Sequence, residues 1–101
     1  MTDHIRVKAG EVLVVPLEGS AGTGFRWELA SSAAATKRFV TLIDSDQEAL
    51  STIPGGRTLQ RFRFQTLASG KVQLTFRYRR SWEAADSGTV QTVSVQIDPA
   101  E

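Results

Sequence analysis

The feature that most constrains the fold is a hydrophobic period of two, which recurs along most of the chain. From Lys71 to Arg79, apolar and polar side chains alternate at every position. Successive side chains of a β-strand point to opposite faces, so this alternation is typical of a strand with one buried face. The same pattern occurs over 92–98, 59–66 and 25–29. The chain is therefore expected to be all-β.

Three further segments complete the predicted architecture. Glu11 to Leu17 is apolar on both faces, as a strand in the interior of a sandwich can be. Phe39 to Ile43 and, more weakly, Ile5 to Lys8 also read as strands, and the alanine-rich stretch from Ser31 to Thr36 could form a short helical turn. About seven strands separated by turn-rich stretches predict an immunoglobulin-like β-sandwich of two packed sheets. The 101 residues correspond to a single domain, 1–101.

Composition removes several classes of protein from consideration. The chain is 41% hydrophobic and 23% charged, which fits a folded domain rather than a disordered segment. The net charge of +1 gives no general attraction to nucleic acid or membrane, and no apolar run of about 18 residues is present. The N-terminus lacks the pattern of a secretory signal, so the chain as written is expected in the cytoplasm, or in the periplasm or outside the cell if a signal peptide was removed.

Catalysis by this chain is not expected, and neither is a cofactor or a bound metal. The single histidine, His4, lies near the N-terminus, and there is no cysteine to act as a nucleophile, a thiolate ligand or a disulfide partner. Asp44, Asp46 and Glu48 could suggest calcium, but their spacing lacks the glycine and the distant glutamate of an EF-hand loop. A solvated acidic loop is the favoured interpretation.

Function is therefore sought in the connections between strands. Three connections are prominent: Gly19 to Gly24, Asp44 to Arg57, and Arg79 to Gly88. They follow the second, fourth and sixth predicted strands. In a chain that runs alternately up and down, all three would emerge at the same end of the sandwich.

The glycine-rich first connection is not a phosphate-binding loop. Such a loop should open a helix and, in its Walker form, bring a lysine, whereas a strand with period two begins at Phe25. An ordinary turn is the simplest interpretation of this loop taken alone, and the same holds for Pro54-Gly55-Gly56.

Taken together and in order, the three loops resemble the chagasin family, the inhibitors of papain-like cysteine peptidases. The first loop of that family reads Asn-Pro-Thr-Thr-Gly-Phe/Tyr, followed shortly by Trp, and the corresponding residues here are Ser20, Ala21, Gly22, Thr23, Gly24 and Phe25, then Trp27. The Gly-X-Gly-Gly-like element of the middle loop is partly matched by Ile53, Pro54, Gly55 and Gly56. The Arg-Pro-Trp/Phe of the third loop corresponds to Arg80, Ser81 and Trp82, which follow the aromatic Tyr78.

This resemblance implies a monomeric inhibitor that binds a papain-like cysteine peptidase through these three loops. The first loop would enter the active-site cleft and place Thr23 near the catalytic cysteine, while the other two loops lie on either side. Trp82 would offer a large rigid surface, and Arg80 would steer toward an acidic rim or brace its loop. Phe25 and Trp27 would anchor the base of the first loop in the core.

The chain also departs from the family pattern. Ser20-Ala21 replaces Asn-Pro, Gly22 replaces the first Thr, and Ser81 replaces the Pro of the third motif. Proline fixes φ and glycine frees it, so these loops are expected to be softer and to lose more entropy on docking. Weaker or differently selective inhibition is the consequence.

Several interpretations remain open at this level. Trp82 could cap one end of the core instead of contacting a partner. Arg61, Arg63, Arg77 and Arg79 lie on outward faces of what could be neighbouring strands, where a solvated sheet face is favoured over a polyanion site because the total charge is near zero. The alternative to an inhibitor is a noncatalytic β-sandwich module that binds a protein or carbohydrate ligand.

Overall fold

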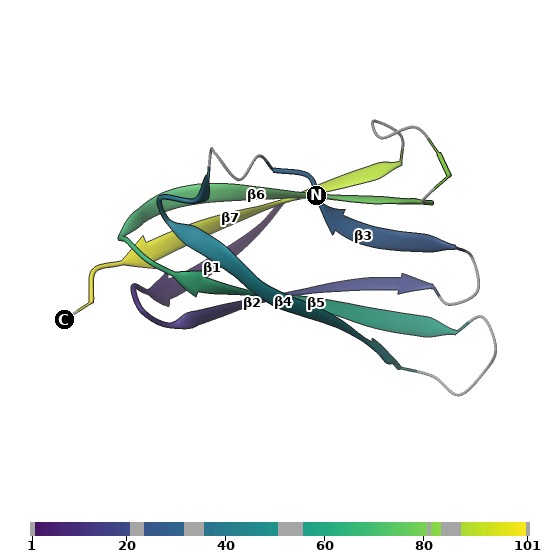
Figure 1. The fold of residues 1–101 in the computed structure, drawn as a ribbon, viewed down its shortest axis with the longest axis horizontal. Helices are drawn as coiled ribbons and strands as arrows, with labels where there is room; N and C mark the ends of the chain where they lie inside the picture. Colours follow the sequence, from purple (N-terminus) through teal and green to yellow (C-terminus); the bar gives the residue numbers. More distant parts are fainter. Residues whose placement is uncertain are drawn as a thin grey trace.

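The computed structural model describes residues 2–20, 24–31, 36–50, 56–80, 82–83 and 88–100. These residues form seven strands (Figure 1): β1 Thr2–Lys8, β2 Val12–Ser20, β3 Phe25–Leu29, β4 Val40–Ala49, β5 Arg57–Thr66, β6 Gly70–Arg80 and β7 Thr89–Asp98. The predicted all-β fold is confirmed. No helix in the described ranges has the length and apolar character needed to cross a membrane.

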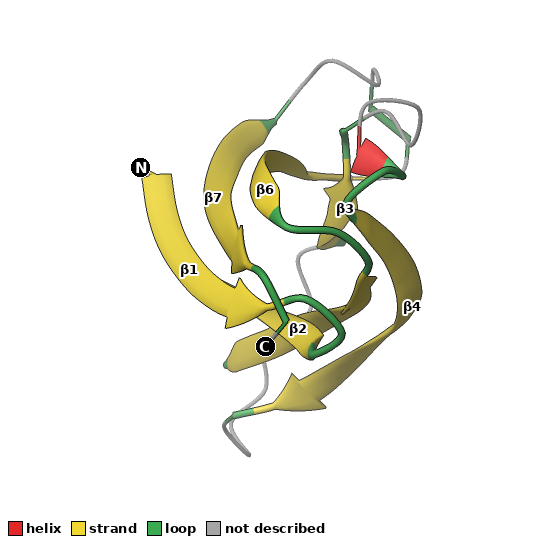
Figure 2. Cartoon of the chain, turned by 90° about the vertical axis from the view of Figure 1, so that its left-hand side faces the viewer, coloured by secondary structure: helices red, strands yellow, loops and turns green. Residues whose placement is uncertain are grey.

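The strands are arranged in two sheets that pack as the layers of a sandwich (Figure 2). Sheet A has the strand order β1-β7-β6-β3, and sheet B has the order β2-β5-β4. The pair β1 and β7 is parallel, and the other neighbours are antiparallel. The first strand lies beside the last, and not beside the second as in an immunoglobulin constant domain. The chain therefore shares the two-sheet sandwich architecture of immunoglobulins but not their strand order.

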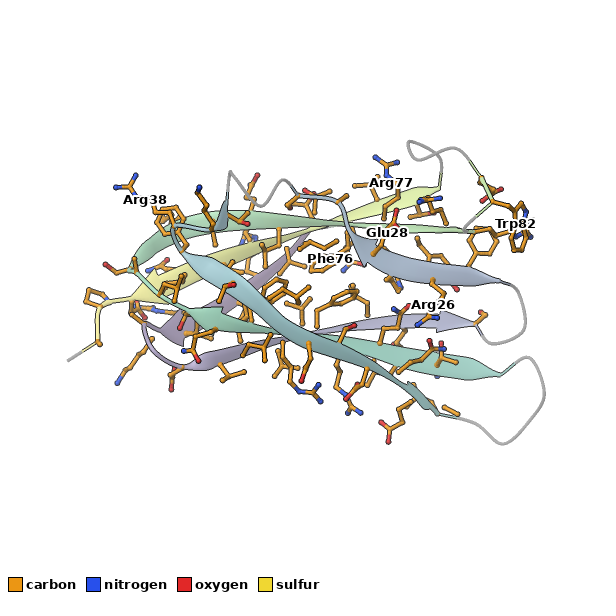
Figure 3. The ribbon with its side chains drawn as sticks, viewed as in Figure 1. Arg26, Glu28, Arg38, Phe76, Arg77 and Trp82 are labelled. Carbon is orange, nitrogen blue, oxygen red and sulfur yellow. The ribbon has the colours of Figure 1, made fainter. Side chains whose placement is uncertain are left out.

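The core lies between the two sheets and is built from the inward positions of the alternating strands. Phe76 of sheet A has no exposed surface, and its ring lies 5.0 Å from that of Phe62 and 6.4 Å from that of Phe64, both in sheet B. Aromatic rings from the two layers therefore interlock (Figure 3). The buried apolar residues are Leu13, Val15, Leu17, Trp27, Val40, Phe62, Phe64, Val72, Leu74, Phe76, Val93, Val95 and Ile97.

A buried amide also joins the sheets. The side chain of Gln60 in sheet B accepts a hydrogen bond from the Trp27 N–H at 2.7 Å and donates one to the Trp27 carbonyl at 3.1 Å. Trp27 lies on β3, an edge strand of sheet A, so the amide takes the place of a neighbouring strand. The position of Gln60 on the same inward face as Phe62 and Phe64 was the one signal in the sequence that could have indicated this role.

The expectation that the second strand is buried on both faces is wrong. Leu13, Val15 and Leu17 are buried, but Val12 and Val14 are 49% and 41% exposed. β2 is an edge strand of sheet B and has a covering layer on its inward side only. Apolar side chains on both faces therefore do not require burial on both faces.

The acidic run does not form a loop. β4 continues to Ala49, so Asp44, Asp46 and Glu48 lie on a strand. A register shift between Leu42 and Asp44 places these carboxylates opposite β5, where Arg63 bonds Asp44 at 2.9 Å and Asp46 at 2.6 Å. Arg61 bonds Asp46 at 3.1 Å and Glu48 at 3.2 Å. The predicted solvated acidic loop is thus replaced by a cross-strand network of ion pairs.

The four arginines that were expected on neighbouring strands lie in different layers. Arg61 and Arg63 belong to β5 in sheet B, whereas Arg77 and Arg79 belong to β6 in sheet A. The helical turn expected from Ser31 to Thr36 falls largely on residues 32–35, outside the described residues.

Candidate functional site

The ends of the three connections meet at one end of the sandwich, at the right of Figure 1. In sheet B, Ser20 at the end of β2 is paired with Arg57 at the start of β5, and in sheet A, Phe25 is paired with Arg80. The middle connection begins at Leu50 rather than at Asp44, and the Leu50 N–H bonds the Arg57 carbonyl at 2.9 Å. The predicted clustering is confirmed, and we call this region the loop end.

The structure describes about half of the predicted site residues. Ser20, Gly24, Phe25, Gly56, Arg80 and Trp82 are among the described residues, and all lie at the loop end. The other predicted residues fall outside the described ranges; they are Ala21, Gly22, Thr23, Ile53, Pro54, Gly55 and Ser81.

Trp82 projects from the loop end instead of capping the core. It is 72% exposed, more than any other large apolar residue described (Figure 3). Its ring lies against Gly24, where an added Cβ would come within 2.7 Å of the indole Cη2 atom. Gly24 also has φ of +80°, a conformation that L side chains rarely adopt. The positive φ therefore favours glycine at this position, and the absence of a side chain lets the indole lie against the backbone, so the third loop rests on the base of the first.

Arg80 packs between aromatic rings. Its guanidinium carbon lies 4.5 Å from the ring centroid of Phe25 and 5.8 Å from that of Trp82, which is the geometry of cation–π attraction. The ring of Tyr78 lies 5.1 Å from Phe25 and 4.8 Å from Trp27. These five residues form a continuous series, the aromatic–arginine stack, which leads from buried Trp27 to exposed Trp82. Trp27 anchors the base in the core as predicted, while Phe25 is only half-buried.

The hydroxyl of Tyr78 ties the first loop to the opposite sheet. It accepts a hydrogen bond from the Ser20 N–H at 2.9 Å, although the two residues belong to different layers. Gly19 permits this approach, because an added Cβ there would lie 2.9 Å from the same hydroxyl. The Trp27 indole N–H donates to the Glu18 carbonyl at 2.9 Å beside it. The sequence alone marks Tyr78 only as the aromatic end of a strand.

Arg79 braces the start of the third loop. Its guanidinium bonds the Glu28 carboxylate at 2.6 Å and donates to the carbonyls of Arg80 and Glu83 at 3.1 and 3.0 Å. The turn is closed by the Glu83 N–H, which bonds the Arg80 carbonyl at 3.1 Å. The Arg79 side chain is only 17% exposed, so the expectation of a solvated position is wrong for this arginine. Arg79, which directly precedes Arg80, also braces the loop, a role that the sequence had suggested for Arg80.

The loop end is suited to binding a protein. An exposed tryptophan lies against Gly24 and next to the Arg80 guanidinium, and the strands below it are joined by side-chain bonds that are formed before any partner arrives. Tryptophan and arginine are enriched at the energetic centres of protein interfaces. The ordering of these groups in the free molecule also lowers the entropy lost on association.

The solved structures similar to this chain share its fold. The cysteine protease inhibitor EhICP2 from Entamoeba histolytica has a TM-score of 0.69 and 21% identity, with 95% of this chain and 85% of that chain covered. PbICP-C, solved in complex with falcipain-2, gives a TM-score of 0.64 at 19% identity, with 99% and 90% covered. Amebosin, solved in solution, gives 0.68 at 20% identity, with 97% and 95% covered.

The family of this chain follows from its sequence. No curated protein sequence matches significantly. The sequence model of the family described as chagasin family peptidase inhibitor I42, however, matches residues 6–97, which include all seven strands in whole or in part and all three loops. This chain belongs to the chagasin family of peptidase inhibitors.

Proposed function

We propose that this protein is a reversible inhibitor of papain-like cysteine peptidases that closes the active-site cleft of the enzyme with its loop end. The observation that carries the proposal is Trp82, which is 72% exposed and lies against Gly24 and 5.8 Å from the Arg80 guanidinium. A large, exposed aromatic side chain beside an arginine is the kind of residue from which interface hot spots are built. Two similar structures support the class of partner, since EhICP2 is described as a cysteine protease inhibitor and PbICP-C was solved with falcipain-2.

In this proposal the three loops have distinct roles. The first loop enters the cleft with Thr23 next to the catalytic cysteine, and the other two loops contact the cleft walls. Inhibition needs no reacting group on the inhibitor, because the first loop excludes substrate without presenting a peptide bond in line with the nucleophile. In this proposal the chain acts as an inhibitor and has no catalytic role of its own. The contact residues are Ser20, Ala21, Gly22, Thr23, Gly24 and Phe25 in the first loop, Ile53, Pro54, Gly55 and Gly56 in the second, and Arg80, Ser81 and Trp82 in the third.

The bonds at the loop end compensate for the proline residues that the family pattern has and this chain lacks. The Tyr78 hydroxyl fixes the Ser20 N–H at the start of the first loop, and the Trp82 ring covers Gly24 at its end. Arg79 holds the carbonyls at the start of the third loop. Both loops are thus constrained at their bases by side chains, which reduces the entropy that docking must remove.

Titration of the intact protein against papain and several related enzymes tests the proposal. We expect stoichiometric inhibition that is reversed by dilution, with trypsin unaffected because the loop end is shaped for a cysteine-peptidase cleft. Inhibition of none of the papain-like enzymes at micromolar protein would contradict the proposal. In that case a noncatalytic binding module with the same fold would be the better description.

A further inference from the structure

The outer faces of the two sheets differ in charge. On sheet B the arginines are matched by carboxylates, because Arg57 pairs with Glu18 while Arg61 and Arg63 pair with the acidic residues of β4. On sheet A, the described carboxylates that point outward are Glu28 and Asp98. The cations on that face are Arg6, Lys8, Arg26, Lys71, Arg77 and Arg79. A chain with a net charge of only +1 therefore carries its positive charge on one face.

A groove of about 490 Å³ runs across this basic face, over β1, β7 and β6. Its polar lining consists of His4, Arg6, Lys71, Gln73, Ser94 and Gln96, and we call it the basic groove. Both Arg6 and Lys71 are register partners of Gln96, so the two cations flank one amide across three strands. Neighbouring strands are about 4.8 Å apart, which puts the backbones of Arg6 and Lys71 roughly 10 Å from each other.

The cations of the groove are available to a ligand. The Arg6 side chain bonds Asp98 at 2.7 Å through Nε, but it remains 72% exposed. Lys71 is exposed, and Lys8 lies beside Asp98 in the register of β1 and β7. The groove therefore combines positive charge with amide and hydroxyl groups that can donate hydrogen bonds.

We propose that the basic groove binds a linear sulfated polysaccharide. Sulfate groups match the spaced cations, while sugar hydroxyls match Gln73, Ser94 and Gln96. The concave shape suits a narrow chain better than a flat anionic bilayer. A site for single-stranded nucleic acid would be expected to offer Phe, Tyr or Trp rings for stacking, and the described residues that line the groove include none.

This site does not depend on the proposed inhibition. The groove lies on the outer face of sheet A, and the proposed peptidase contacts lie at the loop end, so both partners can be bound at once. A failed inhibition assay would leave the groove untouched, and a failed polysaccharide assay would leave the inhibitor proposal untouched.

The test is a calorimetric titration with heparin at several salt concentrations, using two double variants that remove the same formal charge. Arg6→Gln with Lys71→Gln changes the basic groove, and Arg61→Gln with Arg63→Gln is the matched control on sheet B. Because each cation that pairs with the polyanion releases counterions, log K should fall linearly with log salt. We expect the groove variant to lower the magnitude of that slope by about two. The control should leave it unchanged.

Three results would overturn the proposal: no heparin binding at about 50 mM salt, equal losses in the two double variants, or tighter binding to single-stranded DNA or to anionic vesicles than to heparin. Thermal melts of both variants establish that any loss concerns folded protein. Unchanged melting with the expected difference in slope would support the site.

Discussion

The two ends of the sandwich are closed in different ways. At the end opposite the loops, which we call the distal end, bonds between backbone groups occur beside bonds from short polar side chains. The Ala9 N–H bonds the Asp98 carbonyl at 2.8 Å and the Leu67 N–H bonds the Phe39 carbonyl at 2.7 Å, while the Thr66 hydroxyl bonds the Glu11 carbonyl at 2.6 Å. At the loop end, the cross-sheet and turn contacts are made largely by the side chains of Gln60, Tyr78 and Arg79. The distal end therefore combines backbone bonds with a few side-chain bonds, whereas the loop end depends more on particular long side chains.

The two ends are therefore expected to contribute to different properties, the distal end to stability and the loop end to binding. Bonds between backbone groups are available to many sequences, so the distal end depends less on particular residues than the loop end does. Closure by side chains needs particular residues at particular positions, and it leaves Trp82 exposed at the loop end. The comparison predicts that substitutions in the distal half will change stability alone, while those in the aromatic–arginine stack will change binding.

The largest expected effect tests the distal half. Phe64 lies near the end of β5 and is 1% exposed. Phe64→Ala should lower the free energy of unfolding by about 3–5 kcal/mol, because it leaves a cavity in the core. Urea unfolding measures this loss. The inhibition constant of the folded fraction should stay the same, and a weaker constant would show that the two ends are not separable.

Next in size is the loss of the amide between the sheets. Gln60→Leu leaves the Trp27 N–H and carbonyl without their partner, and each buried group left in this way costs about 1–3 kcal/mol. The matched control is Gln65→Leu, which removes an amide that bonds the Gly10 carbonyl at the distal end, where Gln65 is only half-buried. The control should lose less stability in the same unfolding experiment. Equal losses would argue against a special role for Gln60.

A smaller effect is expected from Tyr78→Phe, which removes only the hydroxyl that accepts the Ser20 N–H. Stability should fall by about 1 kcal/mol, as for a single hydrogen bond, and the complex with papain should dissociate faster because the first loop is less ordered. Thr66→Val serves as the control, since the Thr66 hydroxyl bonds the Glu11 carbonyl at 2.6 Å at the distal end. If both variants changed the dissociation rate alike, Tyr78 would have no positioning role.

The smallest expected effect is on the decline of the melting temperature at acidic pH. Hydrogen bonds from Arg63 and Arg61 lower the pKa of Asp46 below its ordinary value. The folded state thus holds the ionised form more strongly than the unfolded state does, so the stabilisation is present above about pH 4 and is lost as the pH falls through the lowered pKa. Melting temperature measured between pH 6 and pH 2 should decline less steeply in Arg63→Gln than in the native chain. Identical slopes would show that the ion pairs of β4 and β5 do not contribute.

Much of the fold follows from the period of two, because burial of one face dictates alternation whatever the partner strand is. The meeting of three loops at one end follows from the order of the strands. The extension of β4 could not be predicted in this way, since the register shift at Leu42 and Asp44 interrupts the alternation and its charges resemble a loop. The burial of Gln60 could not be predicted either, because the backbone groups of Trp27 that bond its amide lie on a strand of the other sheet.

The sequence indicated where the candidate site lies, but not which contacts between residues build it. The motif around Gly24 and Trp82 indicated the loop end, yet the contact between the two residues depends on positions far apart in the chain. The bond from Ser20 to Tyr78 likewise joins two sheets. The near-zero total charge does not reveal the basic face of sheet A, because the sum includes acidic residues on sheet B and outside both sheets; those on sheet B are Glu18, Asp44, Asp46 and Glu48.

The most direct test of the inhibitory loop end is Trp82→Ala, studied by inhibition of papain and by thermal melting of the same sample. We expect inhibition to weaken by about 2 kcal/mol or more, roughly thirtyfold, with little change in melting temperature because Trp82 is 72% exposed. Leu67→Ala, which shortens an exposed apolar side chain at the distal end, should change neither quantity appreciably. A large drop in melting temperature with unchanged inhibition by the folded protein would contradict the account.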